Sequence, residues 1–150
     1  MGQKLTPSVQ AAFAGEGLTT YQGVTLASMV EQEVGSGKQS DQTQVAQVFL
    51  SRLKSNSTLG SDVTARYGAI IAGKAPSLSY DSPYNTLIHP GLPPTPISTI
   101  STNSLYAATH PAATNWLYFV TGDNGNTYFS TNLQDHQTQT QQYCHKLCGQ

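Results

Sequence analysis

The segment Thr25–Val34 reads TLASMVEQEV, and the predicted fold is organised around it. Ahead of it, the spacing of Thr19 and Gln22 is typical of a capping box, which marks the start of a helix. Gly35 directly follows the segment, and glycine commonly ends a helix. The sequence therefore predicts a helix that begins near Thr19 and ends at Gly35.

Two glutamates near the end of this helix are predicted to have opposite surroundings. At about 100° per residue, an apolar stripe runs along the helix, formed by Leu26, Met29 and Val30. Glu33 falls within this stripe, whereas Glu31 projects about 140° from Leu26 and is expected to reach water. A carboxyl group on an apolar face loses the hydration of its charged form, which raises its pKa toward values that suit a general acid. Glu33 is therefore the candidate catalytic residue.

The position of Glu33 also has a structural interpretation. A carboxylate on an apolar stripe often lies at the edge of the stripe or pairs with a cation, and Arg52 and Arg66 are the candidate partners. Perturbed carboxylates occur in structural ion pairs as well as in active sites. Periodicity alone leaves both interpretations open.

Composition indicates one globular domain with a polar, weakly charged surface. The 150 residues suffice for a domain that buries roughly 70% of its unfolded surface. Eight tyrosines and one tryptophan argue against disorder. Because the net charge is −1 and lysine and arginine do not cluster, we expect no nucleic acid partner. A neutral polar surface suits an uncharged, hydroxylated ligand such as a glycan.

The sequence indicates neither a membrane span nor a signal peptide. No apolar run approaches the roughly 18 residues that a spanning helix needs. The stretch Met1–Leu5 lacks the apolar region of a signal peptide. We therefore expect the chain itself to be soluble.

Two further helices are predicted in the first third of the chain. Thr6-Pro7 is typical of a helix start, and this helix is expected to end near Gly15 or Gly17. Another helix starts at Ser40-Asp41 and has apolar residues at core-facing spacing, namely Val45, Val48, Phe49 and Leu53. We expect it to pack against the preceding helix as a hairpin.

The middle of the chain combines a helix with a proline-rich stretch. Gly60-Ser61-Asp62 is typical of a helix start, and Gly73 of its end. The predicted buried face of this helix comprises Val63, Tyr67, Ile70 and Ile71. The stretch Pro76–Ile100 holds most of the prolines, which excludes a helix or a central strand. It is either a linker or, as its apolar residues favour, an ordered loop packed on the domain.

The last third is predicted to contain a helix, a hairpin and a second helix. Ser101–His110 is compatible with a helix, and Trp116–Val120 is the clearest strand in the chain. An Asn-Gly turn separates this strand from Thr127–Ser130, which is a strong signal for a β-hairpin. A polar, glutamine-rich helix follows from Thr131. Together these elements predict an α+β, helix-rich single domain spanning residues 1–150.

Neither a metal site nor a serine nucleophile is predicted. The four histidines lack metal-binding spacing, and Cys144 and Cys148 with His145 lack two further ligands of a zinc site. The two cysteines form a disulfide only if the helix frays there, and two free thiols are equally compatible with the sequence. No GxSxG motif occurs, which argues against a serine hydrolase.

A second carboxylate distinguishes two kinds of chemistry at Glu33. Retaining and inverting glycosidases need a partner carboxylate about 5–9.5 Å away. Asp62 is the best-placed candidate, although it is also typical of a helix N-terminus. A site poor in carboxylates instead suits a reaction in which the substrate supplies its own nucleophile.

Several motifs together resemble the catalytic domain of the MltG-like (YceG-like) endolytic murein transglycosylases. They are LASMVEQE (Leu26–Glu33), VAQVFLSRL (Val45–Leu53), LGSDVTARYG (Leu59–Gly68), SPYNTLIHPGLPPTPI (Ser82–Ile97), AATHPAATNWLYFV (Ala107–Val120) and YFSTNLQDHQ (Tyr128–Gln137). Their order and spacing match the family from about Thr20 to Gln137. The family pattern IVEKE maps onto Met29–Glu33, and its essential glutamate falls on Glu33.

The resemblance implies a lysozyme-like fold with a small hairpin and an ordered proline-rich loop. It implies cleavage of the MurNAc–GlcNAc β-1,4 bond inside peptidoglycan strands, with formation of a 1,6-anhydro ring. Glu33 would act first as general acid and then as base. The implied substrate-binding residues are Ser61, Asp62, Thr64, Tyr67, Tyr84, Asn85, Thr86, Gly91, Leu92, Pro93 and Pro94, and Asn85 is the first choice for orienting Glu33 or the substrate N-acetyl group.

The resemblance also carries expectations about partners and location. The implied partners are peptidoglycan strands and cell-wall synthesis enzymes, with no metal and no cofactor. The implied location is extracytoplasmic, where family members are tethered to the inner membrane. The family's N-terminal anchor and LysM-like subdomain do not occur in this sequence, and Thr95 replaces a glycine of GLPPGPI. The alternatives are a peptidoglycan hydrolase that uses Glu33 with Asp62 and an inactive glycan-binding module.

Overall fold

The computed structural model describes residues 4–35 and 38–146. Within these residues it has an α+β fold, as predicted. The elements are α1 (Pro7–Gly15), α2 (Thr20–Glu33), α3 (Gln39–Lys54), α4 (Asp62–Ile71), α5 (Thr102–Thr109), β1 (Tyr118–Thr121), β2 (Thr127–Ser130) and α6 (Leu133–Tyr143). None of the helices in the described part of the chain has the length and apolar character that crossing a membrane requires.

The starts of α1 and α2 follow the capping residues that the sequence indicated, whereas α3 begins at Gln39, just before the predicted Ser40-Asp41. The Thr19 side chain accepts a hydrogen bond from the Gln22 backbone N–H at 3.1 Å, and the Gln22 side chain accepts one from the Thr19 N–H at 3.0 Å. This reciprocal pair is the predicted capping box. Thr6 caps α1 in the same position, with Pro7 in its first turn. The predicted bounds of α1 and α2 are therefore confirmed to within a residue or two.

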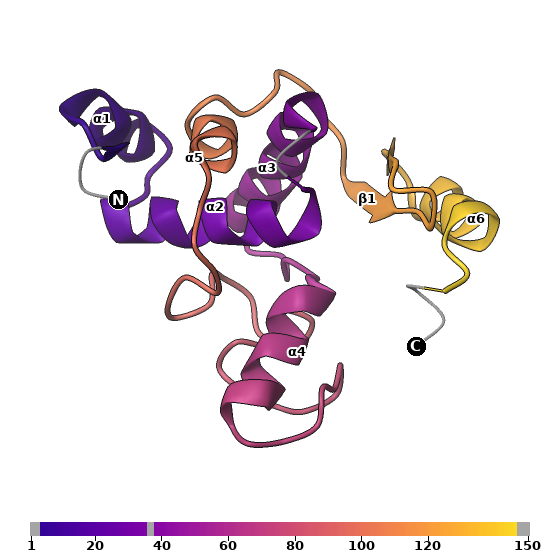
Figure 1. Cartoon of the computed structure of the whole chain (residues 1–150). Coiled ribbons are helices and arrows are strands. Elements are labelled where there is room, and N and C mark those ends of the chain that lie inside the picture. The colour runs from indigo at the N-terminus through magenta and orange to yellow at the C-terminus, as the bar shows by residue number, and fades with distance from the viewer. Residues whose placement is uncertain (1–3, 36–37, 147–150) are drawn as a thin grey trace.

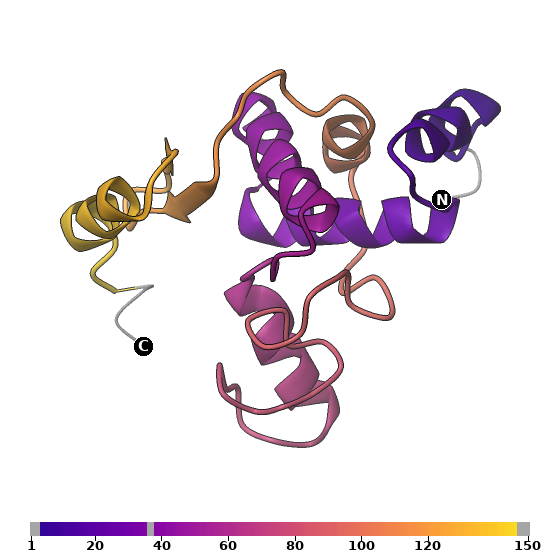
Figure 2. The same cartoon turned by 180° about the vertical axis from the view of Figure 1, so that it is seen from behind.

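The hydrophobic core lies where α5 packs on both α2 and α3 (Figures 1 and 2). Its largest fully buried side chains include Phe13, Leu26, Met29 and Phe49. The helices α2 and α3 pack together, but α3 crosses α2 instead of running alongside it in a hairpin. The hairpin prediction was therefore wrong, and α5 packs against both helices.

Glu31 is partly exposed, so it reaches water, but it is less exposed than predicted because it also contacts α5. Its Oε1 accepts hydrogen bonds from the Ser101 backbone N–H at 2.7 Å and from the Ser104 hydroxyl at 3.3 Å. Both donors belong to the start of α5, where backbone N–H groups lack partners within the helix. Glu31 therefore holds α5 on α2, a contact between distant segments that helical periodicity does not reveal.

The predicted face of α4 is only half correct: Val63 and Tyr67 pack against the hydrophobic core, but the two isoleucines do not. Ile70 and Ile71 are 55% and 53% exposed, whereas Thr64, Ala65, Gly68 and Ala69 are buried. The small residues face the loop that follows, and a Cβ atom at Gly68 would lie 2.0 Å from the Ser82 Oγ. The helix therefore presents its small-residue face to the proline-rich loop, which approaches closely.

The proline-rich stretch is an ordered loop, as the sequence favoured, and not a linker. Between α4 and α5 the chain forms turns and bends without a helix or strand. Ile97 and Ile100 join the hydrophobic core, and the Ile97 N–H donates to the buried Ser28 hydroxyl at 3.0 Å. This loop is thereby fixed to α2.

The hairpin and α6 form the side of the molecule opposite α1 (Figures 1 and 2). β1 and β2 pair antiparallel, with Val120 opposite Tyr128. α6 packs on both strands, and the Tyr143 ring stacks on the Tyr128 ring at 3.9 Å. Cys144, which follows α6, is disulfide-bonded, and Cys148 lies outside the described residues. Of the two cysteine interpretations, a disulfide is therefore the one that the structure adopts.

Candidate active site

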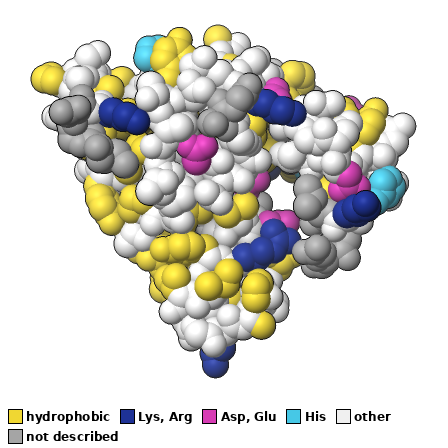
Figure 3. Space-filling view, in the orientation of Figure 1, with side chains coloured by type: hydrophobic (Ala, Val, Ile, Leu, Met, Phe, Trp, Pro, Cys, Tyr) yellow, Lys and Arg dark blue, Asp and Glu magenta, His cyan; other side chains and the backbone are white. Residues whose placement is uncertain are grey.

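A cleft of about 490 Å³ lies between the end of α2, the start of α4 and the wall made by β1 and α6. The molecule is hollowed on this side, and acidic and basic side chains gather at the hollow (Figure 3). The lining residues are Gln32, Glu33, Arg52, Gly60, Asp62, Val63, Arg66, Phe119, Val120, Thr121, His136 and Thr140. The cleft thus combines two carboxylates, two guanidinium groups and an imidazole.

Glu33 is the last residue of α2, and its partly buried carboxyl group lines the cleft. Burial raises its pKa from 4.5 to about 7, and the negative charge of Asp62 also raises it. A hydrogen bond from Ser61 and the positive charges of Arg66 and Arg52 act in the opposite direction. Neither arginine lies within the 4.0 Å that defines an ion pair with Glu33 among the described residues. The pKa of the carboxyl group is therefore raised toward neutral pH, and the group forms no ion pair with the arginines of the described residues.

Ser61 positions the Glu33 carboxyl group. Ser61 is the N-cap residue of α4, yet its side chain does not cap the helix. Its hydroxyl instead donates to Glu33 Oε1 at 2.6 Å. The Ser61 N–H in turn donates to the hydroxyl oxygen of Thr86 at 3.0 Å, and the hydroxyls of Thr86 and Thr64 are 2.7 Å apart. A buried hydroxyl network thus fixes the serine that contacts the candidate acid.

The substitution Ser61→Ala tests this contact. The hydrogen bond favours the ionised form of Glu33, so its removal should raise the pKa of Glu33 above about 7. We expect the high-pH limb of the cleavage rate to move to higher pH and the maximal rate to fall roughly tenfold, because the acid is less well oriented. The pH dependence of cleavage measures both effects. Ser55→Ala, at an exposed serine beyond α3, is the control, and an unshifted limb in Ser61→Ala would contradict this role.

Arg52 joins two walls of the cleft. Its Nη1 donates to the Leu59 carbonyl at 2.6 Å, and its Nη2 donates to the Leu117 carbonyl at 2.8 Å. The guanidinium group also lies 5.6 Å from the centre of the Tyr118 ring. It therefore ties the segment before α4 to the start of the hairpin while leaving a positive charge near Glu33.

His136 faces the cleft from α6. Its ring stacks on Tyr118 with a centroid distance of 5.1 Å. Burial lowers the pKa of His136, and the charge of Arg52 lowers it further, which favours the neutral imidazole. This wall therefore offers a neutral hydrogen-bonding ring next to aromatic surface.

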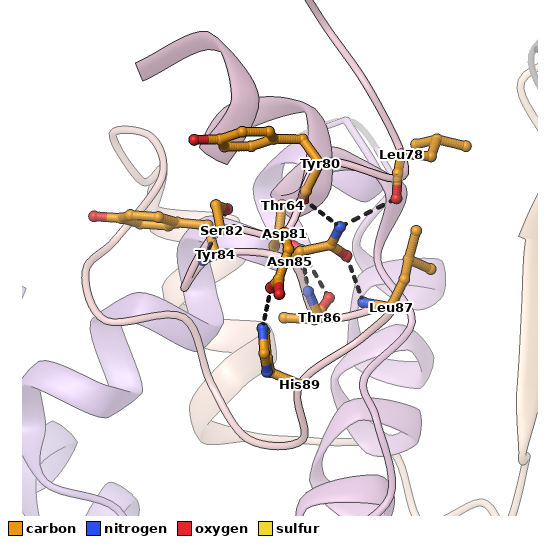
Figure 4. Close-up of polar contacts among 10 residues, drawn as sticks. All are labelled: Thr64, Leu78, Tyr80, Asp81, Ser82, Tyr84, Asn85, Thr86, Leu87 and His89. Atoms are coloured by element: carbon orange, nitrogen blue, oxygen red, sulfur yellow. Dashed lines mark hydrogen bonds and ion pairs between the residues drawn. The ribbon is translucent and has the colours of Figure 1, made fainter. Parts of the chain in front are cut away.

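Asn85, the first choice for orienting Glu33 or the substrate N-acetyl group, instead has its side-chain hydrogen bonds within its own loop (Figure 4). Its side chain is fully buried. The Nδ2 donates to the carbonyls of Leu78 and Tyr80 at 3.1 and 2.9 Å, and the Oδ1 accepts from the Leu87 N–H at 3.0 Å. All of these partners belong to the loop itself. Asn85 therefore holds the loop together, because an irregular segment must satisfy its backbone polar groups.

Only two of the other expected binding residues lie at the cleft. Ser61 contacts Glu33, and Asp62 lines the cleft. Thr64 and Thr86 are buried behind Ser61, so they support the site without facing it.

The remaining expected residues lie elsewhere. Tyr67 and Tyr84 pack edge to face at 5.1 Å and do not line the cleft. Gly91, Leu92, Pro93 and Pro94 line a separate cleft. Part of the expected set therefore lies at or directly behind the Glu33 cleft, and the rest lies away from it.

Sequence reasoning did not assign Arg52 and His136 to the site. Arg52 was considered only as an ion-pair partner, and His136 lies about 100 residues from Glu33. The resemblance included both segments. That α6 lies across the cleft from α2 depends on the tertiary structure, which these motifs do not reveal. Within the described residues, no group of three or more His, Cys, Asp or Glu side chains could hold a metal ion.

Comparisons with known proteins relate this chain to cell-wall enzymes. The endolytic murein transglycosylase of Bacillus subtilis (strain 168) is 35% identical over 132 residues, covering 84% of this chain and 35% of that protein. The endolytic murein transglycosylase of Streptococcus pneumoniae serotype 2 is 30% identical over 145 residues, covering 91% of this chain and 26% of that protein. The chain thus spans about a third or less of the length of these relatives.

A solved structure and a family model agree with these matches. A crystal structure at 2.6 Å of a yceG-like protein from Listeria monocytogenes superimposes with a TM-score of 0.74 and 32% identity, covering 85% of this chain and 42% of that one. The model of the YceG-like family matches residues 1–142, most of the chain. The chain therefore belongs to the YceG-like family.

Proposed function

We propose that this chain is the catalytic domain of an endolytic murein transglycosylase. It cleaves the MurNAc–GlcNAc β-1,4 bond within peptidoglycan strands and leaves a 1,6-anhydroMurNAc end. The observation that supports this proposal best is the Glu33 carboxyl group, which lines a cleft and has its pKa raised to about 7. The names of the curated relatives point to the same activity.

In the first step, protonated Glu33 donates its proton to the glycosidic oxygen of the leaving GlcNAc. Burial keeps a large fraction of the group protonated near neutral pH, which is the state that a general acid needs. The C–O bond breaks as positive charge develops on the MurNAc ring. The carboxylate of Asp62, which lines the same cleft, stabilises that charge.

In the second step, ionised Glu33 accepts the proton of the MurNAc C6 hydroxyl as its oxygen attacks C1. This attack closes the anhydro ring, returns Glu33 to its protonated form and consumes no water. The attack is intramolecular, so proximity favours it over attack by water. The Ser61 hydroxyl keeps Glu33 Oε1 in place for both transfers.

The proposed substrate implies a location. Peptidoglycan lies outside the cytoplasm, so we propose an extracytoplasmic site of action, with cell-wall synthesis enzymes as partners and a membrane tether, as in the family. The disulfide at Cys144 supports this location, because disulfides persist in oxidising compartments.

A hydrolase is the second candidate, favoured by the presence of Asp62 in the same cleft as Glu33. In that reaction Glu33 protonates the leaving group, and Asp62 activates water or stabilises the intermediate. The products then carry reducing ends in place of anhydro ends.

Mass spectrometry of purified peptidoglycan digested by this chain tests both candidates. Fragments with anhydro ends support the transglycosylase. Fragments with reducing ends overturn it in favour of the hydrolase. Binding to peptidoglycan without any fragments overturns both and leaves a glycan-binding module.

A further inference from the structure

A second cleft, of about 660 Å³, lies away from Glu33. It is bordered by the end of α1, the start of α2, the end of α3 and the GLPP segment, Gly91–Pro94. Its lining shares no residue with the Glu33 cleft. The reaction proposed above leaves this second cleft without a role.

Two opposite charges line the second cleft without pairing. They are Glu16, directly after α1, and Lys54, the last residue of α3. Both residues are described, and their charged groups do not approach within the 4.0 Å of an ion pair. The Glu16 Oε2 atom is buried and has no hydrogen-bond partner. A buried polar atom without a partner is costly, so this oxygen is suited to a donor supplied by a ligand.

The protonation of Glu16 is consistent with a missing cationic partner. Burial raises the pKa of Glu16 from 4.5 to about 7, and the charge of Lys54 only partly offsets this effect. An ammonium group close to the carboxylate would restore its charge.

Most of the remaining lining is apolar, with Gln22 and Thr25 as the polar exceptions. Tyr21 is 54% exposed and lines the cleft together with Leu92 and Pro93. The GLPP segment is followed by Thr95, whose hydroxyl is 2.8 Å from that of Tyr84. Proline also restricts the backbone, so this wall is stiff and suits small apolar side chains.

We propose that the second cleft binds the stem peptide of a peptidoglycan strand, with Glu16 pairing an ammonium group and Lys54 a carboxylate of the peptide. This assignment rests on the proposed function for the identity of the substrate. A stem peptide carries a diamino acid, free carboxylates and alanine methyl groups, which match the charges and the apolar wall. Glycan hydroxyls would leave both charges of the cleft unmatched. Cleavage in the Glu33 cleft is then guided by peptide binding in the second one.

Titration of the chain with a free synthetic stem tetrapeptide containing a diamino acid, followed by NMR, tests the proposal. We expect the amide signals of Gly17 and Gly91 to shift, since both glycines line the second cleft. Glu16→Gln and Lys54→Gln should each weaken binding by about tenfold, because each removes one charge-assisted hydrogen bond. Lys74→Gln, at an exposed lysine outside both clefts, should leave the affinity unchanged and serves as the matched control.

Two results would overturn the assignment. One is an absence of shifts at Gly17 and Gly91, and the other is unchanged affinity in both charge variants. Thermal unfolding of the variants shows that each remains folded.

Digestion of intact and peptide-free glycan strands separates this inference from the proposed function. Equal cleavage of both substrates, with no binding of the tetrapeptide, overturns the proposed role of the second cleft but supports the lytic activity. Peptide binding by a chain that cleaves neither substrate supports the cleft and overturns the activity.

Discussion

Replacing Glu33 with glutamine is expected to reduce peptidoglycan cleavage by about 100- to 10,000-fold. The amide has nearly the shape of the carboxyl group, but it can neither protonate the leaving oxygen nor accept the C6 hydroxyl proton. Ser61 can still donate to the amide oxygen, so the local geometry should persist. The release of soluble fragments from purified peptidoglycan measures the rate.

Substrate binding by Glu33→Gln shows whether a loss of activity comes from lost catalysis or from misfolding, because only a folded variant is expected to bind. Glu33→Gln should sediment with insoluble peptidoglycan as well as the native chain does. Asp41→Asn is the matched control, because it removes a carboxylate in the first turn of α3 that does not line the cleft. Cleavage by Glu33→Gln at the native rate would exclude Glu33 as the acid.

The substitution Gly68→Ala is expected to destabilise the fold by about 2 kcal/mol, which corresponds to a fall of roughly 4–8 °C in the melting temperature. The new Cβ would lie 2.0 Å from the Ser82 Oγ and 2.9 Å from the Tyr84 Cβ. The Ser82 hydroxyl can rotate away, but the Tyr84 Cβ moves only with the backbone. This cost exceeds the gain of about 1 kcal/mol that alanine brings to a helix.

Activity should fall together with stability in Gly68→Ala. The displaced residues directly precede Asn85 and Thr86, and Thr86 holds Ser61 in place. Calorimetry and the cleavage assay measure the two effects. Gly15→Ala, where a Cβ meets no atom within 4 Å, is the control and should lower neither stability nor activity. A Gly68→Ala variant as stable as the native chain would show that the loop does not press on α4.

Local sequence signals predicted most of the helices and the residue at the centre of the site. The capping residues Thr6 and Thr19 lie at the starts of α1 and α2, and the Asn-Gly turn lies between β1 and β2. These signals act over a few residues, so a single sequence reveals them. Helical periodicity likewise placed Glu33 on the apolar side of α2, where burial raises its pKa.

Contacts between distant segments could not be predicted in this way. Helical periodicity places Glu31 on the side of α2 that faces solvent, but the start of α5 packs against it. Asn85 was expected at the catalytic group, yet it is bound by its own loop. The path of a loop without helix or strand depends on its tertiary partners, and no periodicity records that path.

The division of the expected binding residues has the same origin. The GLPP segment lies within the resembling stretch, but the loop carries it to the second cleft, near Glu16 and Lys54. The motif identifies the GLPP segment as part of the resemblance, but only the fold determines which cleft this segment lines.

The most direct test of the account is an NMR titration of the Glu33 side-chain carboxyl carbon in the native chain, assigned by the loss of its signal in Glu33→Gln. We expect a titration midpoint of about 7, so that the group is available as both acid and base near neutral pH. A midpoint at the ordinary value of 4.5 would show that burial does not prepare this carboxyl group, and it would contradict the proposed chemistry.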